Sequence, residues 1–79
     1  MSDPVNHPSH YTYGKFEVID VIEDAVVHAP GPRQAGLQWN ILKYLLRMWH
    51  KGKPVQDAKK AQFYLNRLVE MLEATDKMK

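Results

Sequence analysis

The stretch Leu37-Gln38-Trp39-Asn40-Ile41-Leu42-Lys43-Tyr44-Leu45-Leu46-Arg47-Met48-Trp49-His50 decides the fold, because its apolar residues recur at helical spacing. At about 100° per residue, four of its polar side chains share one narrow sector: Asn40, Lys43, Arg47 and His50. Apolar side chains fill nearly all of the remaining surface, whereas an ordinary surface helix has the opposite proportion. We therefore expect the polar side chains to line a cleft or a subunit junction, where basic donors favour an anion.

A second polar series lies on the helix expected from Pro54 to about Ala74. Its members repeat the spacing of the first series, and they are Asp57, Lys60, Tyr64 and Arg67. The apolar face of this helix consists of Ala58, Ala61, Leu65, Leu68, Val69 and Leu72. We expect the two polar series to face each other across one cleft. The alternative for Asp57 is a simple pairing with Lys60 or Lys53 near the helix start.

The rest of the chain predicts an all-α fold, in which an N-terminal extended arm (residues 1–15) precedes one helical domain (16–79). A first helix is expected from Phe16 to about His28, although its β-branched residues also allow a strand. Residues 29–36 contain two prolines and two glycines and predict a loop, from which Arg33 is free to reach a ligand. The short link at residues 51–54 predicts antiparallel packing of the helices on either side, and hence a small bundle.

Size and composition limit the possible functions. A chain of 79 residues buries too little surface to be stable comfortably alone, so a homo-oligomer is expected. It has no Cys, and no apolar run approaches the roughly 20 residues that span a bilayer. The start of the chain lacks the pattern of a signal peptide, which predicts a cytoplasmic protein with no membrane partner. A formal charge of +2 suits a small anionic ligand better than nucleic acid.

Two further groups of side chains are candidates for chemistry. In the arm, His7, His10 and Tyr11 could bind phosphate, stack on a base or transfer a proton, or they could merely dock the arm. We assign no metal to this pair of histidines, because no Cys accompanies it. The first helix carries acidic residues that could hold Mg²⁺ if the protein is an enzyme, or could form a solvated face; they are Glu17, Asp20, Glu23 and Asp24.

The chain resembles a small phage-encoded family of uncharacterised domains. The resemblance rests on four blocks in order: His7-Pro8-Ser9-His10-Tyr11, Glu17-Val18-Ile19-Asp20, Asn40 with Lys43-Tyr44 and Arg47, and Asp57 with Lys60-Ala61 and Tyr64-Leu65. A longer podophage relative is a nucleotide kinase that acts on deoxynucleoside monophosphates without a recognisable P-loop. The resemblance therefore implies a fold that can hold nucleotides, with Tyr44 among the site residues.

We expect a phage accessory protein of the infected bacterial cytoplasm that binds a phosphorylated nucleotide in an interhelical cleft completed by another subunit. Lys43, Arg47 and Lys60 would neutralise phosphate, Asn40 would bind the base or ribose, and the stacking residue would be Tyr64, Tyr11 or Trp49. Sequestration of a host signalling nucleotide, which would evade host defence, is favoured over catalysis because the sequence has no standard phosphate-binding loop. No catalytic residue is assigned.

Two alternatives stay open. One is phosphoryl transfer of the nucleoside monophosphate kinase type, in which His7 or His10 assists and carboxylates place Mg²⁺. The other is inhibition of a host enzyme through an exposed apolar face, which dimerisation would explain equally well. That face would consist of Trp39, Leu42, Leu46 and Trp49.

Overall fold

The computed structural model describes residues 12–13, 16–50 and 52–77, and their side chains from residue 17 to residue 76 apart from residue 51. Three helices dominate these residues, α1 (Val18–Val26), α2 (Pro32–Arg47) and α3 (Pro54–Lys77). Two short strands precede them, β1 (Thr12–Tyr13) and β2 (Phe16–Glu17), which pair antiparallel. The prediction of an all-α domain with three helices is therefore confirmed.

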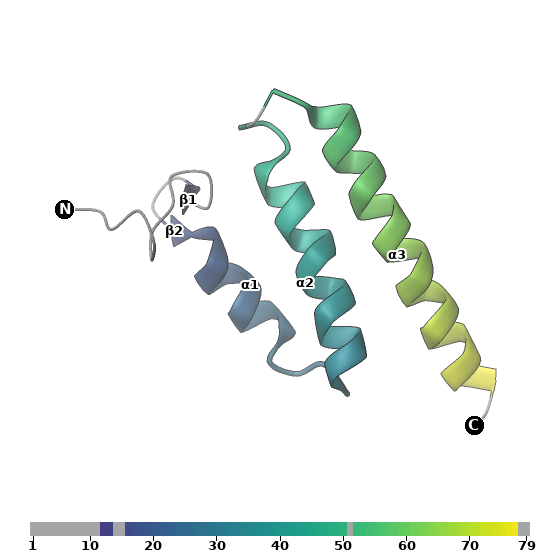
Figure 1. Cartoon of the computed structure of the whole chain (residues 1–79). Coiled ribbons are helices and arrows are strands. Elements are labelled where there is room, and N and C mark those ends of the chain that lie inside the picture. The colour runs from purple at the N-terminus through teal and green to yellow at the C-terminus, as the bar shows by residue number, and fades with distance from the viewer. Residues whose placement is uncertain (1–11, 14–15, 51, 78–79) are drawn as a thin grey trace.

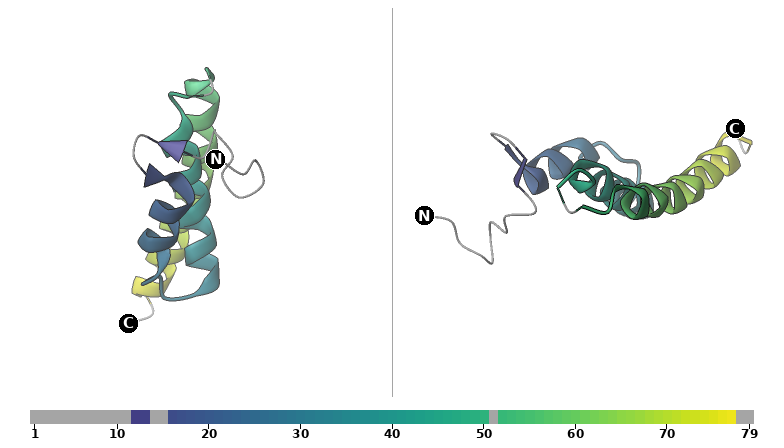
Figure 2. Two further views of the ribbon diagram at one scale, coloured as in Figure 1. Left: turned by 90° about the vertical axis from the view of Figure 1, so that its left-hand side faces the viewer. Right: turned by 90° about the horizontal axis from the view of Figure 1, so that it is seen from above.

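The helices lie side by side in one gently curved row, with α2 in the middle (Figures 1 and 2). α2 packs against both α1 and α3, which lie on opposite sides of it. The chain rises along α2 and returns along α3, so these two helices are antiparallel, as the short link between them predicts. The turn contains Gly52 at φ 73°, a left-handed conformation that costs glycine nothing.

α2 differs from the sequence-based prediction at both ends. It begins at Pro32 rather than near Leu37, because proline at the first helical position has a preset φ and lacks only an N–H that would have no partner in the helix. Arg33 is therefore helical and does not lie in a loop. The helix ends at Arg47, where the backbone N–H of His50 donates to the carbonyl of Arg47 in a turn. His50 thus lies outside the helix that was expected to present it.

The outer helices also differ in length from the prediction. α1 begins at Val18, because the preceding two residues pair with β1, and it ends at Val26 before the Pro-Gly segment. α3 continues to Lys77 instead of ending near Ala74, since no glycine or proline interrupts it. The hydroxyl of Thr75 donates to the carbonyl of Met71 at 3.0 Å within this last part of the helix.

The core is small. Among the described residues, the buried hydrophobic side chains are Val18, Ile22, Ile41 and Ala61. The apolar face predicted for α3 is only partly buried, because the described helices form a single row in which each is covered on the side of its neighbour. Its exposed members are Leu65, Val69 and Leu72. No helix in the described part of the chain has the length and apolar character to cross a membrane.

Candidate functional site

Two stacked tyrosine rings form the centre of the candidate site. Tyr44 projects from the fourth turn of α2 and Tyr64 from the third turn of α3, and their ring centroids are 6.0 Å apart with an interplanar angle of 9°. Phe63 meets Tyr64 edge to face, with centroids 5.2 Å apart and the rings at 84°. Both geometries are favourable for aromatic quadrupoles. The two helices therefore place three aromatic rings together.

Three cationic side chains surround the Tyr44 ring. The Nζ of Lys43 and the guanidinium carbon of Arg47 each lie 4.8 Å from the ring centroid. The Nζ of Lys60, which comes from α3, lies 5.4 Å away. Each distance is within the range of a cation–π interaction. Gathering three positive charges around one ring is unfavourable by mutual repulsion, and a bound anion would relieve it.

One of the three cations has an internal counter-ion. Nη2 of Arg47 donates to Oδ1 of Asp57 at 3.4 Å, and the side chain of Asp57 is only 5% exposed. Asp57 therefore bridges to the neighbouring helix instead of pairing with Lys60 or Lys53. Within the described part of the chain the pair is incompletely satisfied, because Nε of Arg47 and Oδ2 of Asp57 are buried there without a hydrogen-bond partner. Among the described residues, Asp57 pairs with Arg47 alone, so the positive charges of Lys43 and Lys60 have no acidic partner there.

An open groove of about 810 Å³ begins at the tyrosine pair and runs toward the start of α3. Its lining combines aromatic and apolar surface with lysines: Tyr44, Gly52, Lys53, Pro54, Val55, Gln56, Lys59, Lys60, Phe63 and Tyr64. Sequence reasoning named only three of these, Tyr44, Lys60 and Tyr64. The polar spacing on α3 gave no signal for Phe63, which belongs to neither the apolar face nor the polar series.

Of the ten candidate residues, six come together around the tyrosine pair: Lys43, Tyr44, Arg47, Asp57, Lys60 and Tyr64. Asn40 is engaged locally, since its Nδ2 donates to the carbonyl of Gly36 at 3.0 Å. The other three, His7, His10 and Tyr11, lie outside the described residues. Arg67 is separate from the six, because its guanidinium lies over the ring of Phe63 at 5.9 Å.

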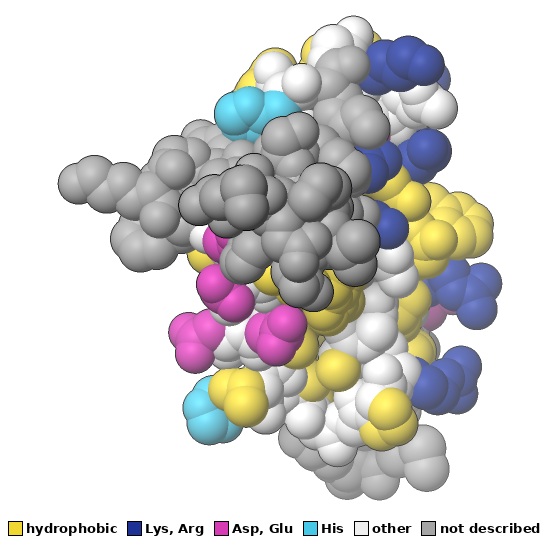
Figure 3. Space-filling view, turned by 60° about the vertical axis from the view of Figure 1, so that its left-hand side comes forward, with side chains coloured by type: hydrophobic (Ala, Val, Ile, Leu, Met, Phe, Trp, Pro, Cys, Tyr) yellow, Lys and Arg dark blue, Asp and Glu magenta, His cyan; other side chains and the backbone are white. Residues whose placement is uncertain are grey.

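The acidic residues of α1 and the basic residues of α2 and α3 lie on different parts of the molecule (Figure 3). Acidic side chains gather below the grey atoms in that view, and Lys and Arg side chains follow the opposite edge. Over the described residues, no three His, Asp or Glu side chains are grouped closely enough to hold a metal ion. The run Glu17 to Asp24 therefore does not form such a group within the described residues.

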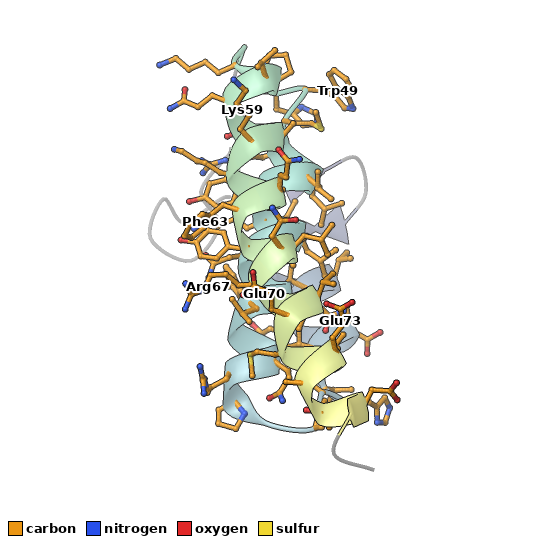
Figure 4. All side chains as sticks on the ribbon, turned by 90° about the vertical axis from the view of Figure 1, so that its right-hand side faces the viewer. Trp49, Lys59, Phe63, Arg67, Glu70 and Glu73 are labelled. Atoms are coloured by element: carbon orange, nitrogen blue, oxygen red, sulfur yellow. The ribbon has the colours of Figure 1, made fainter. Side chains whose placement is uncertain are left out.

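The apolar face that was considered for an inhibitor is not one exposed surface. Trp39, Leu42 and Leu46 are half-buried, whereas Trp49 lies beyond the end of α2 and is 72% exposed. The prediction of a single exposed face is wrong, because three of its four members are half-buried. Trp49 lies on the other side of α3 from Phe63 and Arg67 (Figure 4).

The fold and the site together define a small all-α domain with a cationic, aromatic groove between two antiparallel helices. Residues 5–66 match the model of the family described as protein of unknown function, DUF3310, and the chain belongs to that family. The match extends through α1 and α2 and into α3, so it includes all six residues around the tyrosine pair. Neither the curated proteins nor the solved structures yielded a match.

Proposed function

We propose that this protein binds a phosphorylated nucleotide in the groove between α2 and α3 and holds it without turnover. The observation that carries the proposal is the arrangement at Tyr44, where three cations and a second aromatic ring meet. A nucleotide presents the complementary chemistry, an anionic phosphate joined to a flat base that stacks on aromatic rings.

The phosphate belongs beside Lys43 and Lys60. Their ammonium groups approach the same ring from two helices, and neither is the cation that Asp57 neutralises. Lys60 also lines the groove, so it can contact a phosphate whose base lies deeper along α3. Arg47, held by Asp57, contributes mainly by fixing the two helices and the Tyr44 ring between them. This revises the role that the sequence suggested for Arg47.

The base belongs on the aromatic and apolar part of the groove. Phe63 is 58% exposed, and with Tyr64, Pro54 and Val55 it gives the groove a surface on which a base can stack. A volume of about 810 Å³ falls within the usual range for small-molecule sites, about 300–1,000 Å³. Lys53 and Lys59 at the rim add charge for a second phosphate.

The test is calorimetric titration of the protein with ATP, ADP, AMP, deoxynucleoside monophosphates and a cyclic dinucleotide, with inorganic phosphate as a reference. Lys60→Ala should weaken binding of the best nucleotide by roughly 10- to 150-fold, the equivalent of one charged hydrogen bond of about 1.5–3 kcal/mol. The matched control is Arg33→Ala, which removes an exposed cation from the far end of α2 and should leave affinity unchanged. No binding of any nucleotide, or equal affinity in Lys60→Ala and wild type, would refute the proposal.

The same protein also distinguishes holding from phosphoryl transfer. It is incubated with ATP, Mg²⁺ and each monophosphate, and the products are separated by chromatography. Retention of unchanged nucleotide at up to one molecule per site supports the proposal. Many turnovers per protein molecule would replace it with the alternative of phosphoryl transfer.

A further inference from the structure

The side of the α2–α3 pair that faces away from the groove carries exposed hydrophobic side chains. We call them the apolar stripe, and they are Leu45, Leu65, Val69 and Leu72. Each of the four is between 42% and 49% exposed. Phe63 and Leu65 are two residues apart on α3, so they point about 160° apart around the helix. The stripe and the aromatic groove therefore lie on opposite sides of the helix pair.

Two shallow hollows follow the apolar stripe along α3. One, of about 450 Å³, is lined mainly by apolar side chains of both helices, including Ile41, Leu45 and Leu65. The other, of about 440 Å³, lies further along α3 and is lined by Val69, Leu72, Glu73, Thr75 and Asp76. Hollows of this size between leucine and valine side chains are suited to receiving the side chains of another apolar helix.

We propose that a second copy of this chain covers the apolar stripe, through an antiparallel pairing of the two α3 helices about a two-fold axis. Stable domains are built from two packed layers, and this chain provides one row of helices with four buried hydrophobic side chains among its described residues. A two-fold contact lays the same stripe against itself and so supplies the missing layer.

The charges beside the stripe favour this pairing. Lys59 and Glu73 both lie along the outer face of α3, the face turned toward the viewer in Figure 4. In an antiparallel pair centred on residue 67, Lys59 lies eight residues from the centre, between the levels of Glu73 (six residues) and Asp76 (nine residues) of the other copy. At 1.5 Å per residue, these charges are within about 3 Å of one another along the axis.

The same centre also matches apolar side chains. Leu65 and Val69 are each two residues from residue 67, so Leu65 of one copy lies opposite Val69 of the other. A parallel pairing would instead bring Lys59 beside Lys59 and Glu73 beside Glu73, which is repulsive. Charge and shape therefore select the antiparallel arrangement, with both aromatic grooves left open.

The first experiment is the mass of the 79-residue chain in solution, measured by light scattering after size exclusion. We expect twice the chain mass of 9.2 kDa. Leu65→Glu should give the single-chain mass while still binding nucleotide, whereas Phe63→Ala should keep the dimer mass. The proposal would be overturned if the wild-type protein had the single-chain mass at a concentration of about 100 µM. A dimer mass for Leu65→Glu would overturn it as well. A monomer would also mean that a partner other than a second copy covers the stripe.

The second experiment is a charge exchange, which does not depend on how well Leu65→Glu folds. Glu73→Lys alone should weaken the dimer about tenfold, because two symmetric rim pairs become repulsive. Adding Lys59→Glu in the same chain should restore most of the loss. Both positions are exposed, so the fold tolerates either change. If the double variant dimerises no more tightly than Glu73→Lys, the antiparallel register is overturned. Glu73→Lys should still bind nucleotide, so a weaker dimer in this variant can be distinguished from a failure of the proposed function.

Discussion

The ion pair between Arg47 and Asp57 allows an asymmetric prediction: replacing Arg47 by Ala should cost more stability than replacing Asp57 by Ala. Asp57 is the more deeply buried partner, with its side chain 5% exposed against 15% for Arg47. Arg47→Ala therefore leaves a buried carboxylate without the counter-ion that pairs with it among the described residues, where Oδ2 already has no hydrogen-bond partner. The reverse change leaves a guanidinium that reaches water more easily.

The magnitudes follow from this burial. Breaking a buried pair from one side costs about 3–5 kcal/mol, and the position of Asp57 in the first turn of α3 offsets about 0.5 kcal/mol of it through the helix dipole. We expect about 3 kcal/mol for Arg47→Ala and about 1.5 kcal/mol for Asp57→Ala. For a chain of 79 residues, whose stability is on the order of 4–12 kcal/mol, the first is a large fraction.

Urea unfolding followed by circular dichroism measures the loss of unfolding free energy in Arg47→Ala and in Asp57→Ala. All variants are compared at one protein concentration, so that any self-association contributes equally. The double variant completes a cycle, and its cost should be at least about 1 kcal/mol less than the sum of the two single costs. Arg33→Ala, an exposed cation on the same helix, should change stability by less than about 0.5 kcal/mol. Additive costs in the cycle, or a larger loss for Asp57→Ala, would refute the assignment of a coupled buried pair.

Two further predictions concern the backbone and the core. Gly36→Ala should stabilise the protein by about 1 kcal/mol, because Gly36 is inside α2 and an added Cβ meets nothing within 4 Å. Gly52→Ala should instead destabilise it by about 1 kcal/mol, because its φ is 73° although the space is equally open; thermal unfolding of the two variants should shift in opposite directions. Ile22→Ala should lower the free energy of unfolding by about 3 kcal/mol, because Ile22 is fully buried. Val21→Ala should cost less than half as much in urea unfolding, because Val21 is 42% exposed. Equal losses in the two variants would contradict the packing of α1.

The sequence predicted the three helices and their order because apolar residues at helical spacing and Pro-Gly breaks are local signals. It misplaced the start of α2, since Pro32 was interpreted as a helix breaker when its position at the first helical residue makes it a helix starter. The two-residue strand pair before α1 was missed, because a pairing this short depends on the chain folding back and leaves little trace in residue type.

Helical spacing alone was enough to predict which side chains of each helix share the face that forms the candidate site. The repeat of Lys43 and Arg47 on one helix, with Asp57, Lys60 and Tyr64 on the next, correctly indicated side chains that the two helices bring together. The sequence could not show that Asp57 pairs with Arg47 instead of a neighbouring lysine, because that choice depends on how the helices rotate against each other. The hydrogen bond from Asn40 to the carbonyl of Gly36 lies within α2 and depends on the side-chain conformation of Asn40, which helical spacing does not predict.

Val55 and Lys59, on the first two turns of α3, line both the aromatic groove and the larger hollow of the apolar stripe. These two turns of α3 therefore separate the groove from the hollow and contribute side chains to both. A ligand in the groove that shifts these turns changes the shape of the hollow, and a second copy bound at the hollow changes the shape of the groove. By thermodynamic linkage, each binding event changes the free energy of the other by the same amount. If the groove binds a ligand and the stripe binds a second copy in solution, the ligand affinity will depend on the protein concentration, and the dimer affinity will depend on the ligand concentration.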